Sequence, residues 1–175
     1  MLALVTGGSG SGKSAWAEGL ACGLGTGKRY YLATMYPGGT EAERRIARHR
    51  ALRAGKGFCT LECPLTLPTG RPGDTALLEC LSNWTANRMF APGAPEPAAC
   101  LEALWGELEL SMAQWGHLVV VSNEIFSDGV DYDQATRAYL WLLGGLNRRL
   151  AQRAQLAMEV VCGLPLVLKG TLPQS

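Results

Sequence analysis

Short apolar runs alternate along the chain with longer segments of helix-forming residues. The first run, residues 2–6, ends in glycines, and residues 15–24 then favour a helix, so the chain opens as strand, glycine-rich loop and helix. The clearest strand is the β-branched run 117–122, which is typical of a strand buried on both faces of a parallel sheet. Further strands are expected at 29–34, 58–62, 75–79, 159–162 and 164–168, and further helices at 41–53, between 79 and 92, at 98–114 and at 134–156.

This alternation predicts an α/β fold with a doubly wound, mostly parallel sheet and helices on both faces. The chain has 175 residues, which favours a single domain over 1–175. Ligands of such sheets bind at the carboxyl ends of the strands. Three candidate positions lie there: the glycine loop at 7–12, Glu79 at the end of the 75–79 run, and Asn123-Glu124 after the 117–122 run.

Composition and charge narrow the kinds of partner. The formal net charge is +1 and no block of like charges stands out, which argues against nucleic acid and favours a small molecule. No apolar run is long enough to span a bilayer or to form the core of a signal peptide, so a cytoplasmic location is expected. The six cysteines form no Cys-x-x-Cys pair and are expected to be reduced and mostly buried.

Residues 7–14 read Gly-Gly-Ser-Gly-Ser-Gly-Lys-Ser and match the pattern G-x-x-x-x-G-K-[ST] in full. Glycines let successive backbone N–H groups face an anion, and the following helix directs the positive end of its dipole at the same point. Lys13 is expected to reach the β- and γ-phosphates of ATP or GTP, and the Ser14 hydroxyl to coordinate Mg²⁺. The sequence therefore predicts a P-loop NTPase-like enzyme, with Glu79 or Glu124 as the acid that serves the metal.

The segment expected to form the second helix, 41–53, is rich in arginine and contains His49. Arg45, His49 and Arg53 are spaced to share one helix face, because residues three and four apart are neighbours on a helix. A neutral imidazole can attack phosphorus, while guanidinium groups keep its pKa low and neutralise phosphate oxygens. The segment is therefore either a covalent catalytic site or a solvated basic face on which a histidine happens to fall.

Further motifs lie along almost the full length of the chain. They are Leu4-Val5-Thr6 before the P-loop, Tyr31-Leu32-Ala33-Thr34, Arg45-Ile46 with His49, Leu61-Glu62-Cys63, Leu77-Leu78-Glu79-Cys80, Ser122-Asn123-Glu124, Gly145-Leu146-Asn147 and the ending 163–169. Together they resemble the bifunctional adenosylcobinamide kinase and adenosylcobinamide-phosphate guanylyltransferase family of cobalamin assembly. The resemblance implies that a nucleotide phosphorylates the aminopropanol hydroxyl of adenosylcobinamide. A guanylyl group from GTP is then carried on a histidine to that phosphate, which gives adenosylcobinamide-GDP.

The same resemblance assigns roles to individual residues. It makes His49 the guanylylated nucleophile and Lys13 the second catalytic residue, with the arginines as phosphate clamps. It implies Mg²⁺ held by Ser14 and Glu79, a corrinoid substrate, and a homo-oligomer, specifically a trimer. The residues that it implies for nucleotide binding are Gly7, Gly8, Ser9, Gly10, Ser11, Gly12, Lys13, Ser14, Ala33, Thr34, Met35, Arg50, Ala51, Leu52, Arg53, Glu62 and Glu79.

Three segments depart from the family pattern. Gly10 stands where an arginine is usual, and residues 125–131 read Ile-Phe-Ser-Asp-Gly-Val-Asp in place of Val-Gly-x-Gly-Ile-Val-Pro. The Phe-Arg-Asp run usual before Gly145-Leu146-Asn147 is also absent, and residues 139–144 stand in its place. Two other functions are compatible with the residues. One is a P-loop kinase of another small alcohol, in which Glu79 or Glu124 orients the acceptor and His49 is dispensable. The other is a GTP-dependent regulatory binding protein.

Overall fold

The computed structural model describes residues 1–36, 47, 51 and 53–173. Its centre is a seven-stranded sheet with the order β3-β2-β4-β5-β1-β6-β7. All neighbouring strands are parallel except β6 and β7, which form an antiparallel hairpin at one edge. The strands are β1 (Leu2–Thr6), β2 (Arg29–Ala33), β3 (Phe58–Glu62), β4 (Thr75–Leu78), β5 (His117–Val121), β6 (Leu156–Val161) and β7 (Leu164–Lys169).

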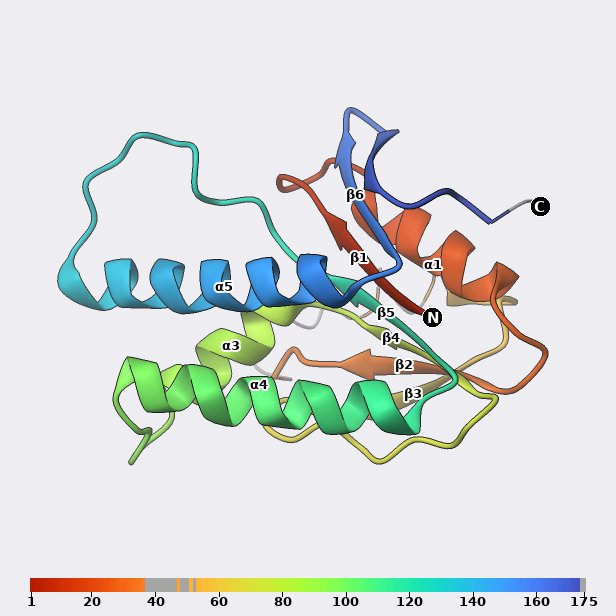
Figure 1. Ribbon diagram of the computed structural model, residues 1–175, viewed down its shortest axis with the longest axis horizontal. Helices are drawn as coiled ribbons and strands as arrows, with labels where there is room; N and C mark the ends of the chain where they lie inside the picture. The colour runs from red at the N-terminus through yellow and green to blue at the C-terminus, as the bar shows by residue number, and fades with distance from the viewer. Residues whose placement is uncertain (37–46, 48–50, 52, 174–175) are drawn as a thin grey trace.

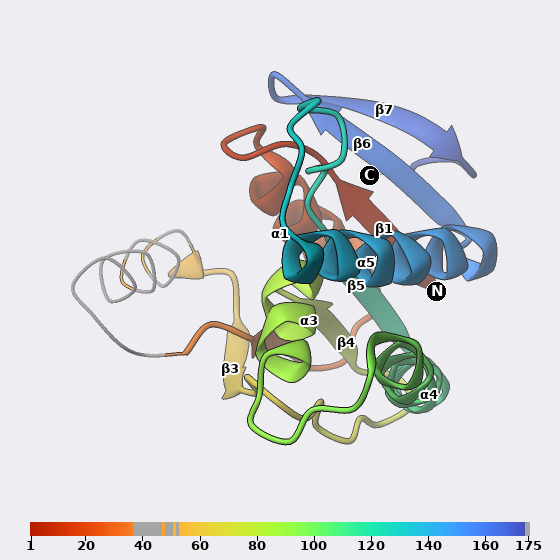
Figure 2. The same cartoon turned by 90° about the vertical axis from the view of Figure 1, so that its left-hand side faces the viewer.

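Helices cover both faces of the sheet (Figures 1 and 2). The helix α1 (Lys13–Gly23) packs on one face, whereas α3 (Leu81–Met89), α4 (Pro97–Gln114) and α5 (Gln134–Arg153) pack on the other. The predicted mostly parallel α/β sheet with two covered faces is therefore confirmed. Of the predicted helix at 41–53, only Ala47, Ala51 and Arg53 belong to the described residues, and these three are helical.

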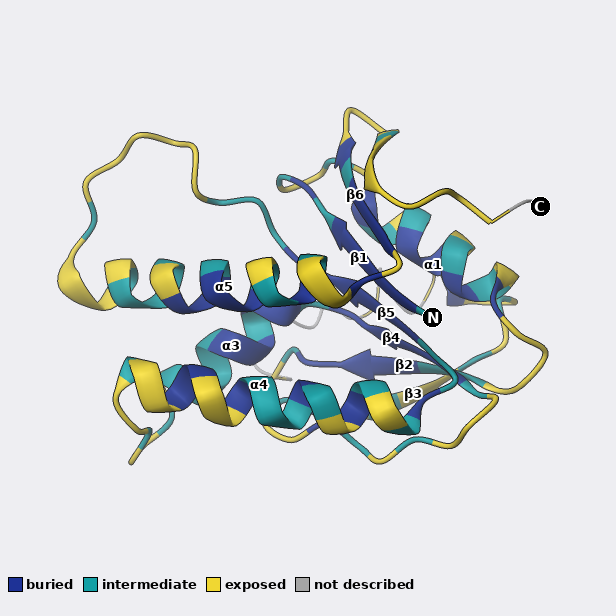
Figure 3. Ribbon diagram, in the orientation of Figure 1, coloured by how far each residue is buried: buried dark blue, intermediate teal, exposed yellow. Residues whose placement is uncertain are grey.

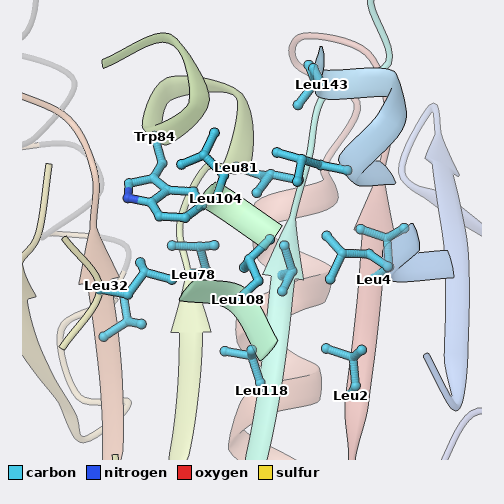
Figure 4. Packing of buried hydrophobic residues seen from close by; sticks show 14 of the residues in the cluster. Leu2, Leu4, Leu32, Leu78, Leu81, Trp84, Leu104, Leu108, Leu118 and Leu143 are labelled. Atoms are coloured by element: carbon cyan, nitrogen blue, oxygen red, sulfur yellow. The ribbon is translucent and has the colours of Figure 1, made fainter. Parts of the chain in front are cut away.

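The two faces of the sheet divide the core because successive strand residues point to opposite sides. Leu118 and Val120 face α3, α4 and α5, while Val119 and Val121 face α1. The larger cluster is built mainly from leucines and includes the fully buried Trp84 at one side (Figure 4). Figure 3 shows the resulting buried central strands and the exposed outer sides of α4 and α5.

The position of β1 decides where a ligand can bind. From β1 the chain passes through α1 to β2, beyond β5 and β4, whereas from β5 it passes through α5 to β6 on the other side of β1. At the carboxyl edge of the sheet, the connection from β1 therefore runs to one side of β1 and the connection from β5 runs to the other side. An open parallel sheet binds its ligands at such a point.

The structure corrects two predicted boundaries in the last third of the chain. The helix α5 ends at Arg153 rather than at 156, and β6 begins at Leu156 rather than at 159. The reason is a contact with a distant strand, because the Gln155 N–H donates to the Leu2 carbonyl (3.0 Å) and the Leu2 N–H donates to Gln155 Oε1 (2.6 Å). This pairing draws the chain beside β1 directly after α5.

The helix α5 runs through Gly144-Gly145 without a break, although glycine is a poor helix former. All six cysteines are free, but only Cys63 and Cys100 are buried, whereas Cys59 and Cys162 are exposed. The expectation of mostly buried thiols is therefore wrong.

In the part of the chain that is described, no helix is long and apolar enough to cross a membrane.

Candidate active site

The phosphate loop connects β1 to α1 at the carboxyl edge of the sheet. Three of its glycines have positive φ angles, with Gly7 at 152°, Gly10 at 72° and Gly12 at 94°. A Cβ atom on Gly7 would lie 2.5 Å from the Val160 carbonyl oxygen, so this position excludes any side chain. The Ser11 N–H donates to the Gly8 carbonyl (3.2 Å), which tightens the loop immediately before the first turn of α1.

Lys13 is the first residue of α1 and is largely buried at the mouth of the loop. Its ammonium group donates to the Gly8 carbonyl across the loop (Nζ–O 2.9 Å). Burial lowers the pKa of Lys13, and the neighbouring Cys80 partly offsets this effect. Cys80 follows Glu79 at the end of β4, so the end of this strand lies near the loop. A largely buried lysine thus holds its ammonium group at the loop, where the phosphates of a nucleotide would lie.

Glu79 follows β4 directly and is also largely buried. Its carboxylate accepts the Thr34 N–H (N–Oε2 3.3 Å), and its own N–H donates to the Leu32 carbonyl (3.1 Å). Strand pairing between β2 and β4 brings these residues together from distant parts of the sequence. Glu79 is therefore an acid held at the carboxyl edge of the sheet, as the sequence predicts.

Thr34 connects the end of β2 to the end of β4 and to α3 through hydrogen bonds. It is fully buried, its hydroxyl donates to the Cys80 carbonyl (3.1 Å), and its own carbonyl accepts from Asn87 Nδ2 (2.8 Å). Its neighbour Ala33 is buried and Met35 is half-buried. Within the segment 33–35, the Thr34 side chain is therefore committed to protein contacts.

Arg53 lies over the face of Tyr31, with its guanidinium carbon 3.4 Å from the ring centre. It also donates to Thr60 Oγ1 (3.5 Å), while its buried NH1 group has no hydrogen-bond partner among the described residues. Burial and the nearby Glu79 carboxylate raise the pKa of Tyr31. Glu62 is exposed at the end of β3, where it pairs in register with Ala33.

The end of β5 lies between the phosphate loop and Glu79, because β5 separates β1 from β4 in the sheet. The Glu124 N–H donates to the Gly7 carbonyl (3.0 Å), whereas its carboxylate accepts from the loop that follows, at Phe126 N and Ser127 Oγ. The Asn123 amide donates to Ser82 Oγ (2.6 Å). Of the two candidate acids, Glu124 therefore has its carboxylate hydrogen-bonded within the loop that follows β5.

The Cys80–Ser82 pair links β4 to Asn123. Ser82 Oγ lies 3.0 Å from Cys80 Sγ, and the Cys80 sulfur accepts from the Asn83 N–H at the start of α3. Burial raises the pKa of the Cys80 thiol. The sequence does not predict a role for Ser82 or Asn87. The only indication of one is their position in the helix that follows Glu79.

The structure brings together part of the predicted site. The loop 7–12, Lys13, Ser14, Thr34 and Glu79 lie at the carboxyl ends of β1, β2 and β4. His49, Arg50 and Leu52 lie outside the described residues, and Ala51 is exposed. Within the described ranges, no group of three or more His, Cys, Asp or Glu side chains is placed to hold a metal ion. The Ser14 hydroxyl and the Glu79 carboxylate are oxygen donors, which suits Mg²⁺ because this ion keeps several of its waters.

These features define a P-loop enzyme of the α/β class, with a glycine-rich phosphate loop after the first strand of a parallel sheet. A solved ATPase from the type III secretion system of pathogenic bacteria has a similar fold. The TM-score is 0.54, and the match covers 95% of this chain and 56% of that one. The sequence identity is 13%, so this likeness shows the fold alone.

The chain belongs to the cobinamide kinase / cobinamide phosphate guanyltransferase family, whose pattern matches residues 3–168. It is 36% identical to the bifunctional adenosylcobalamin biosynthesis protein CobP of Pseudomonas aeruginosa, over 95% of this chain and 96% of that protein. It is 32% identical to the corresponding protein CobU of Salmonella typhimurium, over 97% of this chain and all of that protein. The family resemblance noted in the sequence is therefore confirmed, and the protein is a bifunctional enzyme.

Proposed function

We propose that this protein, acting as one catalytic domain, phosphorylates adenosylcobinamide with ATP or GTP and then converts the product to adenosylcobinamide-GDP. The observation that carries the proposal is the complete phosphate loop in a chain that matches the family over residues 3–168. The loop supplies N–H groups and the positive end of α1 to phosphate oxygens. A nucleotide-using transferase is the activity that this arrangement supports best.

In the kinase reaction, the corrinoid hydroxyl oxygen attacks the γ-phosphorus, the hydroxyl loses its proton, and the bond to the β–γ bridging oxygen breaks. Residues 7–14 would hold the phosphates, and Lys13 would neutralise charge that develops on the transferred group. Ser14 and Glu79 would hold Mg²⁺, which would neutralise negative charge on the phosphates. The contact between Lys13 and the Gly8 carbonyl keeps the ammonium group at the loop until phosphate oxygens replace that carbonyl.

In the guanylyl transfer, an imidazole nitrogen of His49 attacks the α-phosphorus of GTP and pyrophosphate leaves. The phosphate of the phosphorylated corrinoid then attacks the same phosphorus and releases the histidine. The support for this role is the family membership together with the Arg-Ile-x-x-His motif at 45–49. Ala33, Thr34, Met35, Arg50, Ala51, Leu52, Arg53 and Glu62 are proposed to line the nucleotide in one or both steps.

The experiment that tests this proposal follows the guanylyl group. Wild-type protein, a His49→Ala variant and a His117→Ala variant are incubated with α-labelled GTP and Mg²⁺, denatured, and tested for acid-labile, alkali-stable label. His117 is the matched control, because it is the only other histidine and lies at the amino end of β5, away from the phosphate loop. We expect label on the wild type and on His117→Ala but none on His49→Ala. Label that persists on His49→Ala would refute the role of His49.

We further propose that the enzyme works in the cytoplasm as a homo-oligomer, specifically a trimer. The support is the family resemblance and the outer edge strand β7, where Leu164, Leu166 and Leu168 are all exposed. An exposed apolar edge strand favours contact with another protein surface. Light scattering coupled to size-exclusion chromatography measures the mass in solution and tests this proposal directly.

A further inference from the structure

The turn between β6 and β7 lies beside the phosphate loop (Figure 2). β6 runs parallel to β1 as its neighbour, so its carboxyl end reaches the same edge of the sheet. The two turn residues, Cys162 and Gly163, have φ angles of 51° and 81°. Positive φ at both central positions is typical of the tight two-residue turns that join antiparallel strands. The turn is thus a compact element with a defined backbone conformation.

The backbone N–H and carbonyl groups of Gly163 both form hydrogen bonds with residues at the start of the nucleotide site. Its N–H donates to the Ser11 carbonyl inside the loop (2.9 Å), and its carbonyl accepts from Trp16 Nε1 in the first turn of α1 (2.8 Å). The hairpin therefore contacts the loop and the helix that follows it at the same time. This connection joins segments that are almost the whole chain apart in sequence.

Close packing reinforces these hydrogen bonds. A Cβ atom on Gly12 would lie 3.3 Å from the Gly163 Cα, and one on Gly7 would lie 2.5 Å from the Val160 carbonyl oxygen. On the opposite side, the Glu124 N–H holds the Gly7 carbonyl. The phosphate loop is therefore fixed between the end of β5 and the β6–β7 turn.

We propose that the β6–β7 turn, tied by Trp16, holds the phosphate loop in its phosphate-binding conformation, and that Trp16 and Gly163 are positioning residues for nucleotide binding. The inference rests on the proposed nucleotide site at residues 7–14. A phosphate loop binds tightly only when its N–H groups already converge on the anion, because ordering them on binding costs free energy. The hydrogen bond from the Gly163 N–H to the Ser11 carbonyl holds the loop backbone in one conformation before the ligand binds.

The first experiment removes one hydrogen-bond donor and keeps an aromatic ring. The dissociation constant for GTP is measured by calorimetry for wild type, Trp16→Phe, Trp141→Phe and Lys13→Met. Trp141 is half-exposed on α5 and serves as the matched control. We expect Trp16→Phe to bind GTP about five- to tenfold more weakly, the usual effect of one lost hydrogen bond. Trp141→Phe should bind as the wild type does.

The second experiment changes the turn and leaves Trp16 in place. The space around a Gly163 side chain is open, so only the φ of 81° restricts the residue there. Asparagine tolerates a left-handed backbone, whereas valine does not. Gly163→Asn should therefore keep GTP affinity close to that of the wild type, and Gly163→Val should lose it by tenfold or more. A purely structural role would lower the melting temperature of Gly163→Val without this difference in affinity.

The outcomes separate the two proposals. If wild type does not bind GTP, or Lys13→Met binds it equally well, the proposed nucleotide site is wrong. If wild type binds and Lys13→Met does not, but Trp16→Phe and Gly163→Val both stay within twofold of wild type, the positioning role of the turn is wrong. A loss confined to Trp16→Phe and Gly163→Val, with Gly163→Asn and Trp141→Phe unaffected, supports it.

Discussion

Thr34 shows how a predicted site residue is held in place by distant partners. The motif at 31–34 predicts a residue beside the nucleotide, and in the structure the Thr34 hydroxyl donates to Cys80 and its N–H donates to Glu79. Those partners come from β4, which becomes the neighbour of β2 only in the folded sheet. The role of Lys13, in contrast, depends on a local motif and could be predicted from sequence. Residues fixed by distant partners could not be assigned in the same way.

The cysteines allow a prediction at the scale of single residues. The thiolate is the reactive form, so a raised pKa slows alkylation at a given pH. Burial and the Glu62 carboxylate raise the pKa of Cys63 to about 12, and burial also raises the pKa of Cys100. In native protein at pH 8, iodoacetamide should modify the exposed Cys59 and Cys162 first and the buried pair last.

Peptide mass spectrometry over a time course measures the order of alkylation. Raising the pH towards the raised pKa should speed the reaction of Cys63, because its thiolate fraction then increases. A chemically denatured sample is the control, since all six thiols should then react at similar rates. Equal rates for Cys63 and Cys162 in the native protein would contradict the burial described here.

At the scale of elements, α5 is a helix that continues through two glycines, which local helix propensity alone does not predict. Gly144-Gly145 is expected to weaken a helix, because glycine disfavours helix by about 1 kcal/mol relative to alanine. The two glycines differ in their surroundings. A Cβ atom on Gly145 would lie 3.2 Å from a methyl carbon of the buried Leu101 in α4, whereas one on Gly144 would make an ordinary contact with Phe126 at 3.6 Å. Gly145 therefore permits α5 to approach α4, which no local pattern reveals.

This difference predicts opposite effects for two neighbouring substitutions. Gly145→Val should lower the free energy of unfolding by about 1–3 kcal/mol, because its branched side chain overpacks the contact with Leu101. Gly144→Ala should be neutral or raise the free energy of unfolding by up to about 1 kcal/mol, through better helix propensity. Urea denaturation of both variants and wild type measures the two changes. A stabilised Gly145→Val protein would contradict the proposed packing role.

At the scale of the whole molecule, alternating strands and helices predict the fold class but not the order of the strands. The P-loop strand β1 lies between β5 and β6, and β7 closes one edge in the antiparallel direction. Such pairings depend on contacts between residues that are far apart in sequence, as with Leu4, which pairs with Val120 on one side and Ala157 on the other. Sequence periodicity identifies buried strands without naming their neighbours.

The exposed side of β7 supports a prediction about assembly. Replacing Leu168, which is 68% exposed, by glutamate should reduce the mass measured by light scattering towards that of a single chain, since a buried unpaired carboxylate disfavours an interface. Leu110→Glu is the matched control, because Leu110 is 64% exposed but lies on α4 at the other side of the molecule. An oligomer that survives Leu168→Glu and dissociates with Leu110→Glu would place the interface on α4 instead.

The contact between Gly163 and the phosphate loop also bears on the order of synthesis. The ribosome releases residues 7–14 well before the β6–β7 turn at residues 162 and 163. A nascent chain therefore has its phosphate motif long before Ser11 and Trp16 can find their partner in Gly163. We expect chains that do not yet include the turn to hold GTP weakly, so that nucleotide binding becomes tight only after the β6–β7 turn has left the ribosome.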